Sequence, residues 1–193
     1  MDAVPLNLAK EYKKYQYGVV EKGSNARKYG NSLVWLHDAG ITVPCYNLSI
    51  PELPLAGNAK NNEFKVYMRD TGLLVAMLEQ GSQKSVIEGN LGIYKGALYE
   101  NIIADIFTKL DKPLFYFQIP NKLEIDFFIR KDDYATAVEV KSSDNTKSKS
   151  MNSIMGHYGV ERGIKLSTKN MGTYENVEYI PLYMAMYLEN DGF

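Results

Sequence analysis

The sequence predicts a mixed α/β (α+β) fold, in which helices flank a mixed β-sheet. Two observations support this prediction. Apolar residues recur at helical spacing over residues 94–110, and three strand-like patterns follow directly between residues 113 and 143. A shorter helical pattern and two more strands come after them, so helices and strands continue to alternate. With 193 residues, of which 45% are hydrophobic, the chain can bury one large core or two small ones.

The N-terminal third of the chain predicts two helices and two strands. One helix is expected over about residues 6–15 and a second over residues 24–39, which begins at a capping serine or asparagine and ends before Gly40. Pro44 lies in the β-rich stretch that follows. Because proline cannot donate a ladder hydrogen bond, this stretch is expected to be an edge strand. A turn-rich loop and a second strand, residues 63–70, complete this part.

Helix, strand, loop and strand in this order is the plan of a winged helix. We therefore expect a small winged-helix-like segment over residues 1–70 and a second domain over residues 71–193. The second domain opens with a short helix capped by Asp70 or Thr71, and a flexible connector follows it. Its remaining expected elements are the amphipathic helix at about 94–110, strands within 113–119, 123–131 and 134–143, a helix at 150–157, a strand at 163–168, and a last strand and helix from 177 onward.

Composition limits the class of protein. The formal net charge is -1, so no global positive field attracts the chain to nucleic acid or to an anionic membrane, and any such contact depends on local patches. The single cysteine, Cys45, cannot form an internal disulfide, which fits a cytoplasmic location. No apolar run approaches the roughly 20 residues of a membrane span, and the first residues do not resemble a signal peptide.

The two strands at 123–131 and 134–143 carry the acidic residues of interest. If the turn between them is centred on Asp132 and Asp133, counting outward places Asp126 opposite Glu139. Two carboxylates that face each other across a ladder lie about 5 Å apart and repel, unless a cation bridges them. Oxygen ligands of this kind select Mg²⁺ or Mn²⁺, and the neighbouring Lys141 would offset negative charge at a phosphorus centre.

Two alternatives to this metal site remain open. A register slip by one residue would place the two acids on opposite faces of the sheet. The acids could also form an ordinary exposed face, on which Glu124 lies opposite Lys141 as an ion pair. In the strand at 123–131, Leu123, Ile125, Phe127 and Ile129 are expected to share one face, and the acids the other.

Asp126 followed by Glu139-Val140-Lys141 resembles the signature of PD-(D/E)XK nucleases. The resemblance implies a restriction-endonuclease-like fold in which Asp126 and Glu139 ligate a metal, the Val140 carbonyl adds a ligand, and Lys141 assists catalysis. It also implies a helix-borne acid, matched by Glu100, which would hold a second metal or a metal-bound water. On the helix at 94–110 this residue falls just outside the expected apolar stripe of Leu98, Ile102, Ile106 and Leu110.

A wider resemblance covers nearly the whole chain. The segments around residues 33–40, 64–74, 94–104, 123–129 and 137–150 are similar, in the same order, to the C-terminal half of a prokaryotic family of AAA+-type ATPases. That half joins a winged helix to a nuclease-like domain of unknown function. Family members begin with a P-loop ATPase domain, but no GxxxxGK(S/T) run occurs here, so no ATP site is assigned to this chain.

The resemblance leaves three functions open. The first is a divalent-metal-dependent nuclease module of a larger ATP-binding protein. The second is a nuclease-like module that binds nucleic acid or a partner protein, including the parent ATPase domain, without cleaving. The third is an assembly module that forms homo-oligomers. Basic residues at two places could contact a nucleic-acid backbone, although solvated surface is the simpler interpretation: Arg27 and Lys28 in the N-terminal segment, and Lys147 and Lys149 after the third strand.

Overall fold

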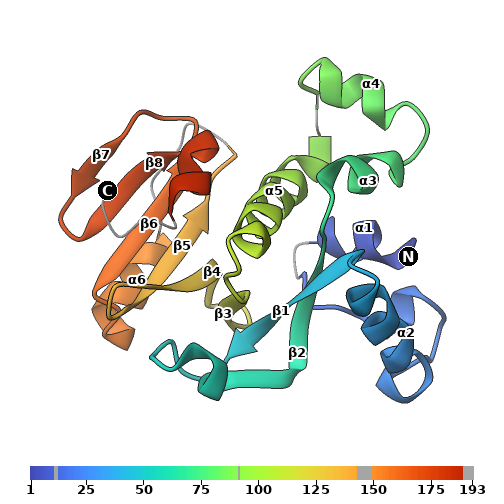
Figure 1. The fold of residues 1–193 in the computed structure, drawn as a ribbon, viewed down its shortest axis with the longest axis horizontal. Helices are drawn as coiled ribbons and strands as arrows, with labels where there is room; N and C mark the ends of the chain where they lie inside the picture. Colours follow the sequence, from blue (N-terminus) through green and yellow to red (C-terminus); the bar gives the residue numbers. More distant parts are fainter. Residues whose placement is uncertain (11–12, 91, 143–148, 189–193) are drawn as a thin grey trace.

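The computed structural model describes residues 1–10, 13–90, 92–142 and 149–188 (Figure 1). Its α-helices are α1 (Ala3–Leu8), α2 (Ala26–Asp38), α3 (Thr71–Ala76), α4 (Ser82–Ile87), α5 (Lys95–Lys109) and α6 (Lys149–Tyr158). Its strands are β1 (Thr42–Leu48), β2 (Ala59–Met68), β3 (Phe115–Ile119), β4 (Leu123–Lys131), β5 (Tyr134–Val140), β6 (Arg162–Ser167), β7 (Gly172–Tyr174) and β8 (Val177–Pro181). Short 3₁₀ turns are η1 (Tyr17–Val19), η2 (Leu55–Asn58), η3 (Gly92–Tyr94) and η4 (Leu182–Tyr187).

The strands of the described residues form one mixed sheet in the order β2-β1-β3-β4-β5-β6-β8-β7. Neighbours are antiparallel in the pairs β1–β2, β3–β4, β4–β5 and β7–β8. They are parallel in the pairs β1–β3, β5–β6 and β6–β8. The prediction of a mixed sheet flanked by helices is confirmed. Within these residues, no helix is long and apolar enough to cross a membrane.

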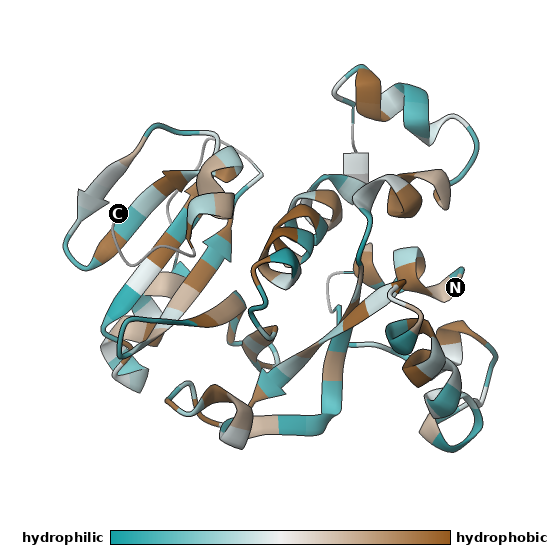
Figure 2. Cartoon of the chain, in the orientation of Figure 1, coloured by the Kyte–Doolittle hydropathy of each residue, from teal (hydrophilic) through white to brown (hydrophobic). Residues whose placement is uncertain are grey.

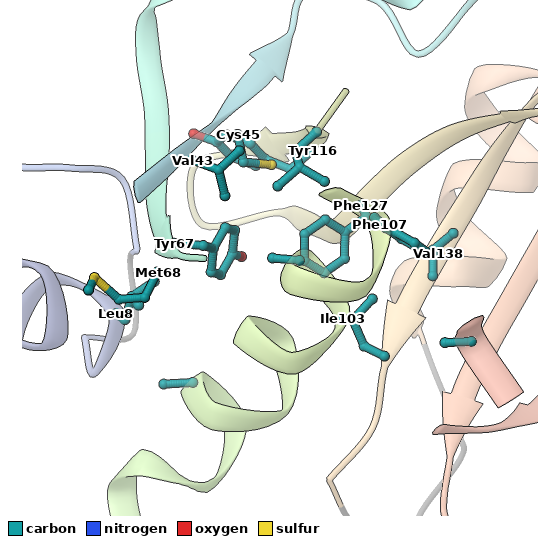
Figure 3. Packing of buried hydrophobic residues seen from close by; sticks show 14 of the residues in the cluster. Leu8, Val43, Cys45, Tyr67, Met68, Ile103, Phe107, Tyr116, Phe127 and Val138 are labelled. Atoms are coloured by element: carbon teal, nitrogen blue, oxygen red, sulfur yellow. The ribbon is translucent and has the colours of Figure 1, made fainter. Parts of the chain in front are cut away.

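Two helices cover opposite faces of the sheet. Phe127 of β4 packs with Phe107 of α5 in one hydrophobic cluster, the α5-side core. Its neighbour Phe128 packs with Ile154 of α6 in a second cluster, the α6-side core. Figure 3 shows side chains from several strands converging on α5, and Figure 2 shows the hydrophobic stretches on this helix and on the strands beside it. Burial on both faces explains why the central strands are so apolar.

The N-terminal strands do not form a separate wing. β1 and β2 belong to the same sheet as the C-terminal strands, and β1 runs parallel to β3. The expectation of an edge strand at Pro44 was wrong, because β1 lies between β2 and β3. Proline is tolerated there because β3 pairs only with Tyr46 and Asn47, which leaves Pro44 without a ladder neighbour on that side. A division of the chain at residue 70 stays a prediction.

Local end signals were informative, and the tertiary context changed other elements. Asn25 caps α2 by accepting a hydrogen bond from the backbone N–H of Arg27 at 3.0 Å, and Gly40 adopts the left-handed conformation, with φ of 71°, after its end. Asp70 caps α3 in the same manner. In contrast, the expected connector contains α4, and the first helix, expected at about residues 6–15, is Ala3–Leu8. Within the described residues, the expected final helix is the 3₁₀ turn η4. The short strand β7 was not predicted.

Candidate functional site

The register of β4 and β5 follows the prediction. Their ladder runs from Lys131 opposite Tyr134 to Phe127 opposite Val138. The turn between them has Asp132 in the left-handed conformation, with φ of 51°, as tight hairpin turns require. The next pair outward in this register is Asp126 and Glu139, but the ladder ends one residue before it. The strands therefore separate at the two acidic residues.

A β-bulge explains why β4 leaves β5 at this point. On its other side, β4 places four residues, from Ile125 to Phe128, against three residues of β3, from Phe115 to Phe117. The extra residue reverses the alternation of side chains. Ile125 therefore belongs to the α6-side core, whereas Phe127 and Ile129 belong to the α5-side core. The expectation that these three residues share one face was wrong, because a bulge cannot be read from an alternating pattern.

Asp126 lies in the fork between the separating strands. Its Oδ2 accepts a hydrogen bond of 2.8 Å from the backbone N–H of Val140, so the carboxylate replaces a backbone acceptor of β4. The pKa of Asp126 is raised to about 7, first by burial and next by the negative charge of Glu100. Lys65, Lys13 and the Val140 N–H act in the opposite direction. An additional positive charge nearby would therefore favour the ionised form of this carboxyl group.

Glu100 reaches the same region from α5. The buried side of α5 includes Glu100 and Asn101, while Ile102 is 41% exposed, so the expected apolar stripe was displaced. Asn101 fixes this rotation of the helix: its side chain accepts from the Met68 N–H at 2.8 Å and donates to the Met68 carbonyl at 3.0 Å. Sequence periodicity missed it because a buried amide with these partners is a tertiary feature.

Two lysines neutralise Glu100. Lys13 forms an ion pair and hydrogen bond with Oε1, and the Tyr67 hydroxyl donates to Oε2 at 3.1 Å. The Lys65 Nζ lies 4.0 Å from Oε2. Although burial acts to raise the pKa of Glu100, the charges of Lys13 and Lys65 lower it below its ordinary value. Glu100 is thus held ionised inside the protein.

Lys65 links β2 to β4. Its side chain is fully buried, and Nζ lies 2.6 Å from Glu124 Oε1 and 4.6 Å from the centre of the Tyr116 ring. Gln118 donates to the other oxygen of Glu124 at 3.0 Å. The expected pairing of Glu124 with Lys141 was wrong, because the strands have separated before they reach this position. We call Lys13, Lys65, Glu100, Glu124 and Asp126 the carboxylate–lysine cluster.

Neither Lys13 nor Lys65 was predicted as a site residue. A signal for Lys65 was present in the sequence, since a lysine stands within the apolar strand Phe64–Met68. Buried lysines are rare unless they are paired, so this position implied an internal acidic partner. Lys13 had no comparable signal. Its partner is 87 positions away in the chain.

Glu139 and Lys141 form a second pair at the end of β5. The Lys141 Nζ lies 2.6 Å from Glu139 Oε1, whereas Oε2 of Glu139 is buried and has no hydrogen-bond partner within the part of the chain that the structure describes. Val138 and Val140 pack toward α5, so alternation directs Glu139 toward the α6 side of the sheet. There it neighbours Lys165 in the parallel ladder with β6.

The predicted site is therefore only partly assembled. Glu100 and Asp126 come together, and so do Glu139 and Lys141. Among the described residues, no hydrogen bond or ion pair joins Asp126 to Glu139, and no group of three or more His, Cys, Asp or Glu side chains is arranged to hold a metal ion. The two acids nevertheless flank the same backbone segment, because Asp126 binds the N–H of the residue that follows Glu139.

Comparisons with known proteins divide the chain in two. Residues 95–185 match the family described as Domain of unknown function (DUF4143). This domain is found in the C-terminal region of AAA-ATPase-type proteins. Residues 1–84 match a second family, Domain of unknown function (DUF8612). No curated protein and no solved structure matched the chain.

The carboxylate–lysine cluster spans both matched regions. Glu100, Glu124 and Asp126 lie within the DUF4143 match, while Lys13 and Lys65 lie within the DUF8612 match. The positive charges that neutralise the acids of the first region are thus supplied by the second. The two regions also share one sheet and the α5-side core. They form one continuous structure around the site.

Three of the four basic residues expected to contact nucleic acid are described, and all three are exposed. Arg27 and Lys28 are exposed in the first turn of α2, where Lys28 pairs with Glu21 at 2.6 Å. Lys149 is exposed at the first residue of α6. Lys147 lies outside the described residues. A role in nucleic-acid binding stays a prediction for all four.

The raised pKa of Asp126 predicts a pH-dependent effect on stability. Its folded pKa of about 7 exceeds the ordinary value of 3.8, so ionisation destabilises the folded protein as the pH rises from about 4 to 7. We expect Asp126→Asn to raise the free energy of unfolding at pH 8 by about 1–2 kcal/mol, a figure reduced for the partial exposure of the group. Urea titrations at pH 4 and pH 8 would test this, because the gain should vanish at pH 4. An equal gain at both pH values would contradict the assignment.

Proposed function

We propose that this chain is the divalent-metal-dependent nuclease module of a larger AAA-type ATP-binding protein, and that it hydrolyses phosphodiester bonds in DNA or RNA. The observation that carries the proposal is Oε2 of Glu139, a buried carboxylate oxygen that has no hydrogen-bond partner among the described residues. A buried oxygen without a hydrogen bond costs about 1–3 kcal/mol. A cation beside Glu139 would remove this cost.

Asp126 and Glu139 are the residues proposed to hold the metal. The pKa of Asp126, raised first by burial and next by the charge of Glu100, is consistent with this role, since a bound cation would stabilise the ionised carboxylate. Asp126 accepts a hydrogen bond from the Val140 N–H, and Glu139 directly precedes Val140 in the chain. The Val140 carbonyl is a further proposed ligand. Carboxylate and carbonyl oxygens are the ligands that Mg²⁺ and Mn²⁺ prefer. The chemistry of this donor set therefore fits, although the two carboxylates must approach each other to share one ion.

Lys141 is proposed as the residue that orients the attacking water and offsets charge at phosphorus. Its side chain is 27% exposed and its ammonium group is already bound to Glu139, so it is both fixed in place and accessible. A bound Mg²⁺ or Mn²⁺ would polarise the phosphodiester and lower the pKa of the attacking water. The protein contributes the positions of these groups and a partly dry environment, in which charges interact more strongly than in water.

Cleavage assays would test the proposed function directly. We expect the intact chain to cut plasmid or single-stranded DNA, or single-stranded RNA, with Mg²⁺ or Mn²⁺ and not with EDTA. Asp126→Ala and Lys141→Ala should each lose this activity. Asp133→Ala is a suitable control, because Asp133 is an exposed acid in the β4–β5 turn. Metal-independent cutting, or equal activity in all variants, would point to a contaminating nuclease and would overturn the proposal.

A second candidate is a binding or assembly module that does not cleave. It is favoured by α2, which has no buried residue and presents Trp35 with 77% of its surface exposed beside Val34 with 55%. Exposed aromatic residues of this size are typical of protein contacts. An ATPase domain or a second copy of the chain would be the partner. Concentration-dependent mass by light scattering, without metal binding or cleavage, would favour this function over the first.

A further inference from the structure

Both oxygens of Glu100 already have hydrogen-bonding or positively charged neighbours. Oε1 is bound by the Lys13 ammonium group, and Oε2 accepts from Tyr67 at 3.1 Å and lies 4.0 Å from Lys65. The side chain is only 5% exposed, so it cannot turn to another partner in solvent. A second divalent ion beside Glu100 would have to displace at least one ammonium group.

The charges in the cluster support the same conclusion. Glu100, Glu124 and Asp126 carry three negative charges when all are ionised, and Lys13 and Lys65 together carry two positive charges. One negative charge remains, and it resides at the fork with Asp126. Glu139 is already paired with Lys141, so a single divalent ion at the fork more than balances the remaining charge. A second divalent ion would leave an excess of positive charge in a buried site, which is unfavourable.

Lys65 and Lys13 are held to different degrees. Lys65 is fully buried, with Glu124 at 2.6 Å and the Tyr116 ring at 4.6 Å. Such a lysine cannot leave without disrupting the junction of β2 and β4. The Lys13 side chain is 16% exposed and pairs with Glu100. Lys13 is therefore the residue whose removal would free an oxygen of Glu100 with the least damage to the fold.

From this geometry we infer that Lys13 and Lys65 are built-in counter-ions that take the place of a second metal ion beside Glu100, so that the site binds one divalent ion per chain. The inference rests on the proposed function, because it presumes a metal at Asp126 and Glu139. It assigns Glu100 a positioning role in place of the predicted role as a metal ligand. Lys13 and Lys65 lie in the region matched by DUF8612. They then determine how many metal ions are bound by the acidic residues of the region matched by DUF4143.

Metal stoichiometry is the test. Calorimetric titration of the full chain with Mn²⁺, with free Mn²⁺ counted by electron paramagnetic resonance, should give one ion per chain. Lys13→Met should give two ions, because Glu100 loses its ammonium partner. Lys13→Arg keeps the charge and should stay at one. Adding Glu100→Gln to Lys13→Met should return the count to one.

The outcomes separate this inference from the proposed function. Two ions in the intact chain, or one ion in Lys13→Met, would overturn the inference and leave the nuclease proposal standing. No ion in the intact chain would overturn both. If Lys13→Met does not fold, as judged by circular dichroism, Lys13→Gln replaces it, since glutamine keeps a polar contact with Glu100 while removing the charge. The same count of two is then expected.

Discussion

Replacement of Lys65 by methionine is expected to lower the free energy of unfolding by about 3–5 kcal/mol. Methionine retains much of the apolar stem, so packing changes little, but the ammonium group is lost. Glu124 then loses its partner at 2.6 Å, and Glu100 loses one of its two positive neighbours. Removing one member of a buried ion pair is strongly destabilising, because the remaining charge is left without compensation. The cation–π contact with Tyr116 is also lost.

Urea unfolding followed by circular dichroism would measure this effect. Lys60→Met is a matched control on the same strand, because Lys60 is exposed and lies 3.7 Å from Glu63. Surface pairs contribute little, so this control should change stability by less than about 1 kcal/mol. The double variant Lys65→Met with Glu124→Leu should recover part of the lost free energy of unfolding, since it also removes the Glu124 carboxylate that Lys65→Met leaves without a partner. A change below about 1 kcal/mol in Lys65→Met itself would show that the cluster does not stabilise the fold.

The parts of the fold that sequence predicted well are those determined by near neighbours. The caps of α2 and α3 require only a side-chain acceptor two or three residues before the N–H that it binds. The register of β4 and β5 follows from a two-residue turn, and it was predicted by counting outward from Asp132 and Asp133. In each case the interacting groups are close in sequence, so the chain encodes the outcome locally.

The parts that were missed depend on distant partners. The bulge in β4 arises where this strand must match both β3 and β5, and no pattern within β4 reveals it. The rotation of α5 is fixed by Asn101 against the end of β2. β1 was expected at an edge of the sheet, because its pairing with β3 is not a local property. In all three cases, tertiary contacts changed the structure that the local sequence pattern predicted.

The candidate site shows the same division. The spacing of Asp126, Glu139 and Lys141 was enough to place the acids at the end of one hairpin. It could not show that the strands separate there, that Asp126 binds the Val140 N–H, or that two lysines from the N-terminal half neutralise Glu100. The electrostatic state of the site is therefore decided by residues outside the motif. This is why the number of bound ions has to be tested separately from their presence.

Glu139→Gln is expected to have the largest effect on activity, a loss of about 10³-fold in cleavage rate, which corresponds to roughly 4 kcal/mol of barrier. Glutamine preserves the shape of the side chain but removes the charge that would bind the metal. Stability should respond in the opposite sense. The buried Oε2 has no hydrogen-bond partner among residues that the structure describes, and Lys141 is exposed enough to remain solvated without its ion pair. We expect the free energy of unfolding to stay within about 1 kcal/mol of the intact chain, or to rise.

This combination separates a functional acid from a structural one. If Glu139 served only to hold the end of β5, Glu139→Gln would weaken the fold and leave metal binding unchanged. If it binds the metal, calorimetry should show a large loss of Mn²⁺ affinity in a protein that unfolds at an unchanged or higher urea concentration. Glu161→Gln, at an exposed acid before β6, should alter neither property. Retention of both cleavage and Mn²⁺ affinity in Glu139→Gln would exclude this residue as the metal ligand.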